Sequence, residues 1–188
     1  MSVLFFMEKF MHKRELEAEI ESKGDYIQID YLLSFLRLTP PHEMRKFAYG
    51  KLAALYMRHQ MFKDAAQAYQ NIAINSITFR DKVNNHVLGT KALIEGGFFE
   101  DAERSLKRAL VDANADQKRE ALEEVRGFYK ELAEDLVSKG KKNKASIYYE
   151  KYLRLELGEE KKGEVKEKLR GIYEGLGKIS EIKLLEGF

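Results

Sequence analysis

Five positions suited to tight turns recur along the chain at intervals of 36, 37, 43 and 37 residues. These turn positions are Gly24, Gln60, Gly97, Gly140 and Gly177. Four residues before each of them stands a large apolar residue, namely Ile20, Tyr56, Leu93, Leu136 or Tyr173. Five residues after each of them comes Ile29, Ala65, Ala102, Ala145 or Ile182. Apolar residues held in phase with a turn predict repeated helix-turn-helix units, in which each hairpin buries its apolar face against its neighbours.

The residues between the turns favour helix. The 188-residue chain has only two prolines, which are adjacent at Pro40 and Pro41, and it is rich in the strong helix formers Ala, Leu, Glu and Lys. We therefore predict a single all-α domain over residues 1–188, with hairpins at residues 2–39, 42–75, 79–112, 116–157 and 159–186. The first helix is expected to run from Ser2 to about Ser22. The second helix is expected to bury Ile29, Leu33 and Leu36.

Two of the units resemble the tetratricopeptide repeat, whose pattern joins an aromatic residue, Leu, a small residue and Tyr to a following Ala-x-x-x-aromatic. The first match is Tyr49-x-x-Leu52-Ala53-x-x-Tyr56 with Ala65-x-x-x-Tyr69. The second match is Tyr129-x-x-Leu132-Ala133-x-x-Leu136 with Ala145-x-x-x-Tyr149. The resemblance implies a right-handed array (an α-solenoid) of about five antiparallel hairpins. The array is expected to be irregular, because its repeats exceed the family's usual length of about 34 residues.

Composition and motif spacing argue against catalytic chemistry. The 33 basic residues nearly cancel the 31 acidic ones, so the net charge of +2 gives no general attraction to nucleic acid or to an anionic membrane. The chain has no cysteine, which suits a reducing compartment and excludes thiolate sites. Its four histidines lack metal-ligand spacing, and no nucleophile, base and orienter can be named. We therefore predict a cytoplasmic, non-catalytic protein without cofactor or metal. Its Lys and Glu content hints at a thermophilic source.

The family resemblance implies a scaffold or adaptor for protein-protein interaction. Its ligand, a peptide or a protein, is expected on the concave face that the first helix of each hairpin forms. Carried onto this chain, the groove candidates are Phe47, Lys51, Arg58, Asn84, Lys91, Glu95, Lys130 and Glu134. The mixed charges on this face favour a partner that carries both signs. A lower-ranked alternative is nucleic-acid binding through the basic turn at residues 139–144, with Tyr148 and Tyr149 nearby.

The N-terminal segment predicts a second alternative, which is self-association. It is apolar on more than one face and includes Leu4, Phe5, Phe6 and Phe10. A terminal repeat normally presents a polar outer face, and a helix apolar nearly all round needs cover on several sides. The alternative function is therefore a homodimeric regulatory protein, with the N-terminal helix in the groove or at the dimer interface. The apolar run is too short to cross a membrane, so we predict no membrane insertion.

Overall fold

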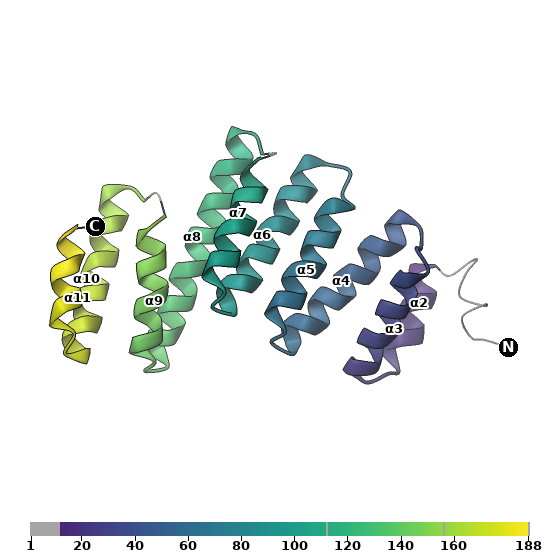
Figure 1. Ribbon diagram of the computed structural model, residues 1–188, viewed down its shortest axis with the longest axis horizontal. Coiled ribbons are helices and arrows are strands. Elements are labelled where there is room, and N and C mark those ends of the chain that lie inside the picture. Colours follow the sequence, from purple (N-terminus) through teal and green to yellow (C-terminus); the bar gives the residue numbers. More distant parts are fainter. Residues whose placement is uncertain (1–11, 112, 156, 188) are drawn as a thin grey trace. The chain divides into compact units, whose positions relative to one another are not determined.

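The computed structural model describes residues 12–111, 113–155 and 157–187, and every regular element in these ranges is helical (Figure 1). The chain divides into two compact units, Met1–Ala121 and Leu122–Phe188. The first unit contains α2 (Lys13–Glu21), α3 (Asp25–Arg37), α4 (His42–Arg58), α5 (Phe62–Ile74), α6 (Phe79–Glu95) and α7 (Phe99–Val111). Helix α8 (Ala115–Ser138) crosses the boundary. The second unit continues with α9 (Lys142–Leu153), α10 (Glu159–Leu176), α11 (Ile179–Leu184) and the short 3-10 helix η1 (Leu185–Gly187). The all-α prediction is confirmed for the described residues.

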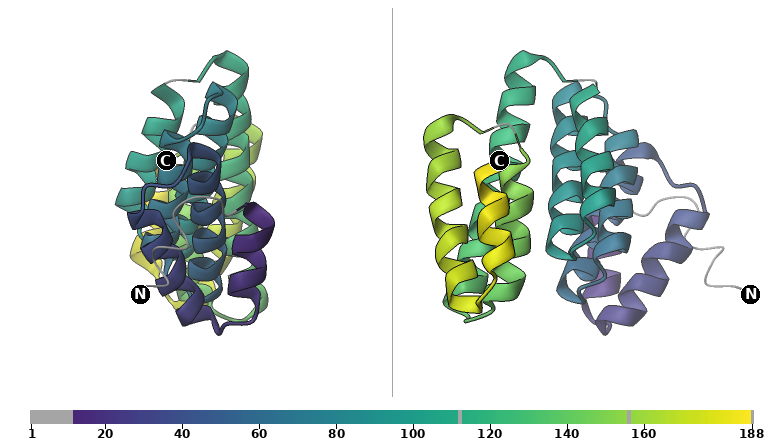
Figure 2. Two further views of the ribbon diagram at one scale, coloured as in Figure 1. Left: turned by 90° about the vertical axis from the view of Figure 1, so that its right-hand side faces the viewer. Right: turned by 60° about the vertical axis from the view of Figure 1, so that its left-hand side comes forward.

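Within each unit, helices that follow one another in the chain pack side by side (Figures 1 and 2). The core of the first unit is built from large apolar residues of α2 to α4, such as Leu16, Leu32 and Leu52, and from small residues of α5. Ala65 and Ala68 let α5 approach its neighbours closely, and both are buried. Gly89 of α6 lies close to α5, because a Cβ atom there would be 3.3 Å from the backbone oxygen of Ala66.

Four of the five predicted turn positions have the left-handed backbone conformation. The φ angle is 56° at Gln60, 76° at Gly97, 70° at Gly140 and 70° at Gly177. At each turn the N–H of the next residue donates to the carbonyl of the apolar residue identified in the sequence, as Phe98 does to Leu93 at 2.8 Å. This hydrogen bond closes the helix in a Schellman motif, so the apolar residue marks the last turn of its helix. Gly24 differs from the other four, because its φ of −64° is ordinary and it caps the start of α3.

The turn at Gln60 yields a stability prediction. A left-handed conformation costs an L-residue about 1–2 kcal/mol, and the greater freedom of glycine in the unfolded chain offsets part of this. Gln60→Gly should therefore raise the free energy of unfolding by about 0.5–1 kcal/mol. The reverse change at the equivalent turn, Gly140→Gln, should lower it by a similar amount, since a Cβ there meets no atom within 4 Å. Urea unfolding followed by circular dichroism measures both, and effects of the same sign would contradict the argument.

The first described helix begins later than the sequence predicted. His12 has an extended backbone, with φ −84° and ψ 163°, so α2 starts at Lys13 and no continuous helix runs from Ser2. The reason is local: the backbone N–H of His12 donates to the Glu15 carboxylate at 2.8 Å, which is the contact of a helix N-terminus. The self-association candidates Leu4, Phe5, Phe6 and Phe10 lie outside the described residues.

Helix α3 buries a different stripe from the one predicted. Its buried side chains are Ile29, Leu32 and Phe35, whereas Leu33 is 37% exposed and Leu36 is half-buried. Both stripes have helical spacing and include Ile29, so periodicity alone does not choose between them. The positions of α2 and α4 decide, because their core residues lie on the Leu32 side of α3.

Ion pairs join helices that are two elements apart in the chain. Examples are Lys13–Glu43 between α2 and α4 at 3.4 Å, Lys46–Asp81 between α4 and α6 at 3.8 Å, Lys63–Asp101 between α5 and α7 at 3.7 Å, and Glu123–Lys161 between α8 and α10 at 3.3 Å. Ion pairs near the surface contribute little stability individually. Their geometry nevertheless shows that these alternate helices lie alongside each other.

Candidate functional site

The second unit contains an open slot between α8 and α10, with α9 as its floor. The slot consists of two hollows of about 340 Å³ and 480 Å³ that share Tyr149 and Lys168. The smaller hollow lies beside Glu123 and Lys161, and the larger one beside Val137 and Ile172. A ligand in this slot would therefore meet an ionic end and a more apolar end.

The floor of the slot is aromatic. Tyr149 and Tyr152 are 2% and 5% exposed, and they lie three residues apart on α9 so that both turn toward the slot. Burial raises the pKa of Tyr149 above its ordinary value. The floor is therefore a packed, uncharged surface at neutral pH.

A charged bridge crosses the slot between its two hollows. Lys168 of α10 donates to the Glu134 carboxylate of α8, and this hydrogen bond raises the pKa of Lys168. The Lys168 ammonium also lies 5.9 Å from the centre of the Tyr149 ring, within the range of a cation–π contact. At the ionic end, hydrogen bonds from Arg126 and Lys161 lower the pKa of Glu123. The walls of the slot thus carry opposite charges that are paired with each other.

Glycines on both walls keep the slot open. Gly127 of α8 lines the smaller hollow and Gly171 of α10 lines the larger one. Glycine inside a helix makes that helix less stable than alanine would, by roughly 0.5–1 kcal/mol. A Cβ atom at either position would meet no other atom within 4 Å, so internal packing does not require glycine there. The effect of these glycines is to leave space in the slot.

The buried donor at the ionic end has no partner. The Nε atom of Arg126 is buried and makes no hydrogen bond within the described ranges of the chain. An unsatisfied buried donor is unfavourable by about 1–3 kcal/mol. The smaller hollow is thus lined by a side chain whose hydrogen-bonding capacity is incompletely used.

The groove candidates predicted on α4 are already engaged with neighbouring helices. Lys51 donates to the Glu17 carboxylate of α2 and lies 5.4 Å from the ring centre of Phe47. Arg58 donates to both carboxylate oxygens of Asp25 on α3 at 2.9 Å. These hydrogen bonds, with one from His59, lower the pKa of Asp25. The two cations on this face are therefore neutralised within the molecule.

The other five candidates fall into two groups. On α6, Asn84 is exposed, whereas Lys91 and Glu95 are half-buried and interact with other residues. On α8, Lys130 and Glu134 both line the slot, where Glu134 meets Lys168. Of the eight predicted residues, Lys130 borders the smaller hollow of the slot and Glu134 borders the larger one.

The basic turn before α9 lacks accessible aromatic rings. Lys141, Lys142 and Lys144 are exposed, and Lys139 pairs with Asp135 at 2.7 Å. Tyr148 and Tyr149 are each only 2% exposed, so they are not available to stack on bases. Lys142 instead lines the larger hollow of the slot.

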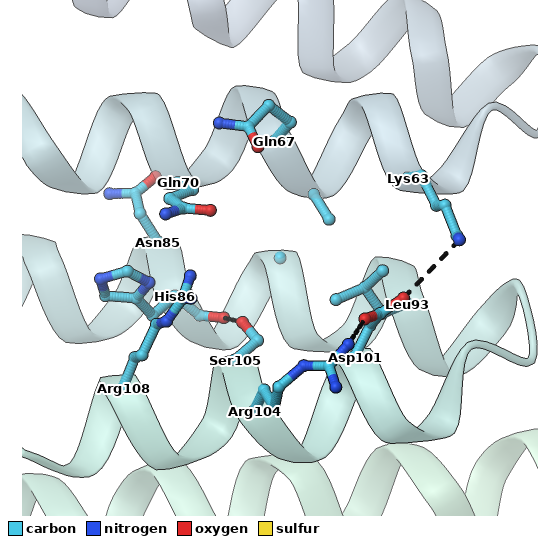
Figure 3. A pocket seen from close by; sticks show the side chains of 12 residues that line it. Lys63, Gln67, Gln70, Asn85, His86, Leu93, Asp101, Arg104, Ser105 and Arg108 are labelled. Atoms are coloured by element: carbon cyan, nitrogen blue, oxygen red, sulfur yellow. Dashed lines mark hydrogen bonds and ion pairs between the residues drawn. The ribbon is translucent and has the colours of Figure 1, made fainter.

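A separate hollow of about 300 Å³ lies in the first unit, between α5 and α7 with α6 as its floor (Figure 3). None of the predicted site residues lines it. His86 is half-buried at the edge of this hollow. One sequence signal was missed: the polar pairs Lys63/Asp101, Gln67/Ser105 and Gln70/Arg108 each have a spacing of 38 residues. They were overlooked because the family resemblance directs attention to the first helix of each hairpin.

Two further classes of site are absent from the described residues. They contain no group of three or more His, Cys, Asp or Glu side chains placed to hold a metal ion. No helix among them has the length and apolar character needed to span a bilayer.

Comparison of the chain with models of known protein families, with curated proteins and with solved structures found no match.

Proposed function

We propose that the protein is a non-catalytic interaction protein that binds a short peptide segment of a partner protein in the slot between α8 and α10. The observation that carries this proposal is the pair of adjoining hollows, held open by glycines that internal packing does not require. Concave sites with an apolar surface and a few convergent polar groups are the usual form of a binding site.

The proposal includes a repeat architecture similar to that of tetratricopeptide repeats. Its support is the phase of the turns, four of which share one backbone conformation, together with the ion pairs between alternate helices. In such an array the first helices of successive hairpins line one face. Helices α8 and α10 are first helices in this scheme, so the slot belongs to the face on which the family resemblance predicts ligands.

The slot suggests the chemistry of the peptide. From Glu123 to Ser138, α8 rises about 22 Å at 1.5 Å per residue, which matches about six or seven residues of extended peptide. The apolar end beside Val137 and Ile172 would take an apolar side chain. The Glu123–Lys161 and Glu134–Lys168 pairs would face charged or polar groups of either sign. The expected ligand is therefore a mixed-charge peptide with an apolar anchor.

Filling the slot tests this function. Peptides are first selected from a displayed library of short random sequences for binding to the full-length wild-type protein. These peptides should bind the Gly171→Gln variant at least about tenfold more weakly than wild type, a loss of about 1.4 kcal/mol in binding free energy. The reason is steric, because the added side chain starts in the open space of the larger hollow. Titration of the selected peptides by fluorescence anisotropy measures the effect.

The matched control is Gly163→Gln. Gly163 lies on the same helix, its Cβ would also meet nothing within 4 Å, and it borders neither hollow. Both variants replace glycine with a better helix former, so neither should unfold the protein. Selected peptides that bind Gly171→Gln as tightly as wild type would place the binding surface elsewhere.

A further inference from the structure

The hollow of the first unit lies between α5 and α7, and residues of these two helices stand opposite each other along its length. Along α5 and α7, Lys63 stands with Asp101 at one end and Gln70 with Arg108 at the other (Figure 3). The floor between them is small and apolar, because Ala66 and Gly89 bring α5 and α6 together. The hollow thus has two polar ends separated by an uncharged floor, and it shares no residue with the slot.

At one end of this hollow, two cations share one carboxylate. Asp101 is the single carboxylate among the lining residues. It accepts a hydrogen bond from Arg104 and lies 3.7 Å from the ammonium of Lys63. Both cations at this end therefore already have a carboxylate partner.

The other end is rich in hydrogen-bond donors, and none of the described residues that line it carries a carboxylate. Figure 3 shows the Arg108 guanidinium beside the His86 ring, with the side chains of Gln70 and Asn85 at the same end. Asn85 uses one amide N–H on the backbone oxygen of Asp81 at 2.7 Å. Within residues 12–111, 113–155 and 157–187, neither a hydrogen bond nor an ion pair engages the side chains of Arg108 and Gln70.

We propose that this end of the hollow binds a carboxylate group of a ligand. The planar guanidinium of Arg108 presents two parallel N–H donors, which is the geometry that a carboxylate accepts. Gln70 supplies an amide donor from the facing helix, and the ligand's methylene groups lie over Ala66 and Gly89. The described residues that line the hollow include three cations, Lys63, Arg104 and Arg108, and the one carboxylate of Asp101, so their charges favour an anionic ligand.

The carboxylate can come from a free organic acid or from an acidic side chain of a peptide. Titration of the ¹⁵N-labelled full-length protein with glutarate, and separately with acetyl-Gly-Glu-Gly-amide, distinguishes these sources. We expect saturable shifts of the side-chain amide signals of Gln70 and Asn85, with a Kd on the order of 1 mM for at least one probe. Glutaramide and acetyl-Gly-Gln-Gly-amide, which lack the negative charge, should produce no saturable shift.

Three substitutions locate the binding. Arg108→Gln should weaken it at least about tenfold. Gln70→Glu should abolish it, because the new carboxylate pairs with Arg108 and occupies the site. Lys107→Gln removes the same charge from the adjacent exposed residue, which does not line the hollow, and should leave the Kd unchanged.

Two results would overturn the proposal. One is the absence of saturable shifts with either anionic probe up to about 10 mM, where a millimolar site would be mostly occupied. The other is an equal effect of Arg108→Gln and Lys107→Gln, which would mean that the anion senses only general surface charge. Gln70→Glu preserves the test if Arg108→Gln disturbs folding, and circular dichroism verifies the fold of each variant.

Discussion

Gly96→Ala is expected to destabilise the protein by about 1–3 kcal/mol, the usual effect of overfilling a packed region. The backbone at Gly96 is ordinary for a helix end, with φ −73°. A Cβ atom there would lie 2.8 Å from the Cβ of Phe62 and 2.8 Å from two ring carbons of Phe98. The Cβ of Phe62 is fixed to the start of α5, so it cannot swing away. Urea unfolding monitored by circular dichroism gives the change in free energy.

The adjacent Gly97 provides the matched comparison, because it is required for a different reason. Its φ of 76° is left-handed, and a Cβ there would meet no atom within 4 Å. Gly97→Ala should therefore destabilise by about 1 kcal/mol through the backbone alone. Gly97→Asn should recover part of this, since asparagine tolerates the left-handed region, whereas Gly96→Asn should not. A neutral or stabilising Gly96→Ala would show that α5 can move aside.

The free energy of unfolding is expected to fall steeply as pH rises above 10, the ordinary pKa of tyrosine. Burial raises the pKa of Tyr56, Tyr149 and Tyr173, and for Tyr173 the hydrogen bond to Glu150 at 2.7 Å raises it further. Since the folded pKa lies above the unfolded one, the unfolded chain releases these protons first. The contribution of each such tyrosine is fully present below pH 10. Above pH 10 it decreases by about 1.4 kcal/mol per pH unit until the pH reaches the folded pKa of that tyrosine.

Tyr173→Phe isolates one of these groups. It should lower stability at neutral pH by about 1 kcal/mol, because the hydrogen bond to Glu150 is lost. It should also make the slope of unfolding free energy against pH shallower by about one proton between pH 10 and 12. The measurement is urea unfolding at several alkaline pH values, with tyrosinate absorbance as a second signal.

The control for Tyr173→Phe is Tyr26→Phe, at a side chain that is 66% exposed. Lysine ion pairs also weaken in this pH range. The free energies of unfolding of the two variants are therefore compared at the same pH. A slope for Tyr173→Phe that equals those of wild type and Tyr26→Phe would rule out a role for the Tyr173 proton.

The helix spans could be predicted because they depend on neighbouring residues. Leu93 and Ala102, which the sequence places in phase with the turn at Gly97, are both buried. The start of α2 was missed because a single capping contact marks it, in which His12 donates to Glu15. The buried stripe of α3 was missed because two stripes fit the same periodicity.

The site was less predictable than the fold. Lys51 and Arg58 were expected to face a ligand, but the carboxylates of Glu17 and Asp25 stand 34 and 33 residues earlier in the chain and face them in the folded structure. Lys130 and Glu134 lie on α8 and border the slot, but its hollows also depend on Tyr149 and Gly171 from two other helices. Arg108 gave no local signal, because its neighbours Gln70 and Asn85 belong to different helices.

The amino-acid sequence alone determined that this protein is helical, where its helices end, and which residues form its turns. These features follow from hydrogen bonds and packing within about five residues, as in the Schellman motif that joins Phe98 to Leu93. Tertiary structure alone decided which charges are neutralised and where the surface is hollow. Those properties depend on the rotation and spacing of helices whose facing residues are 33 to 38 positions apart, as for Arg58–Asp25 and Lys161–Glu123.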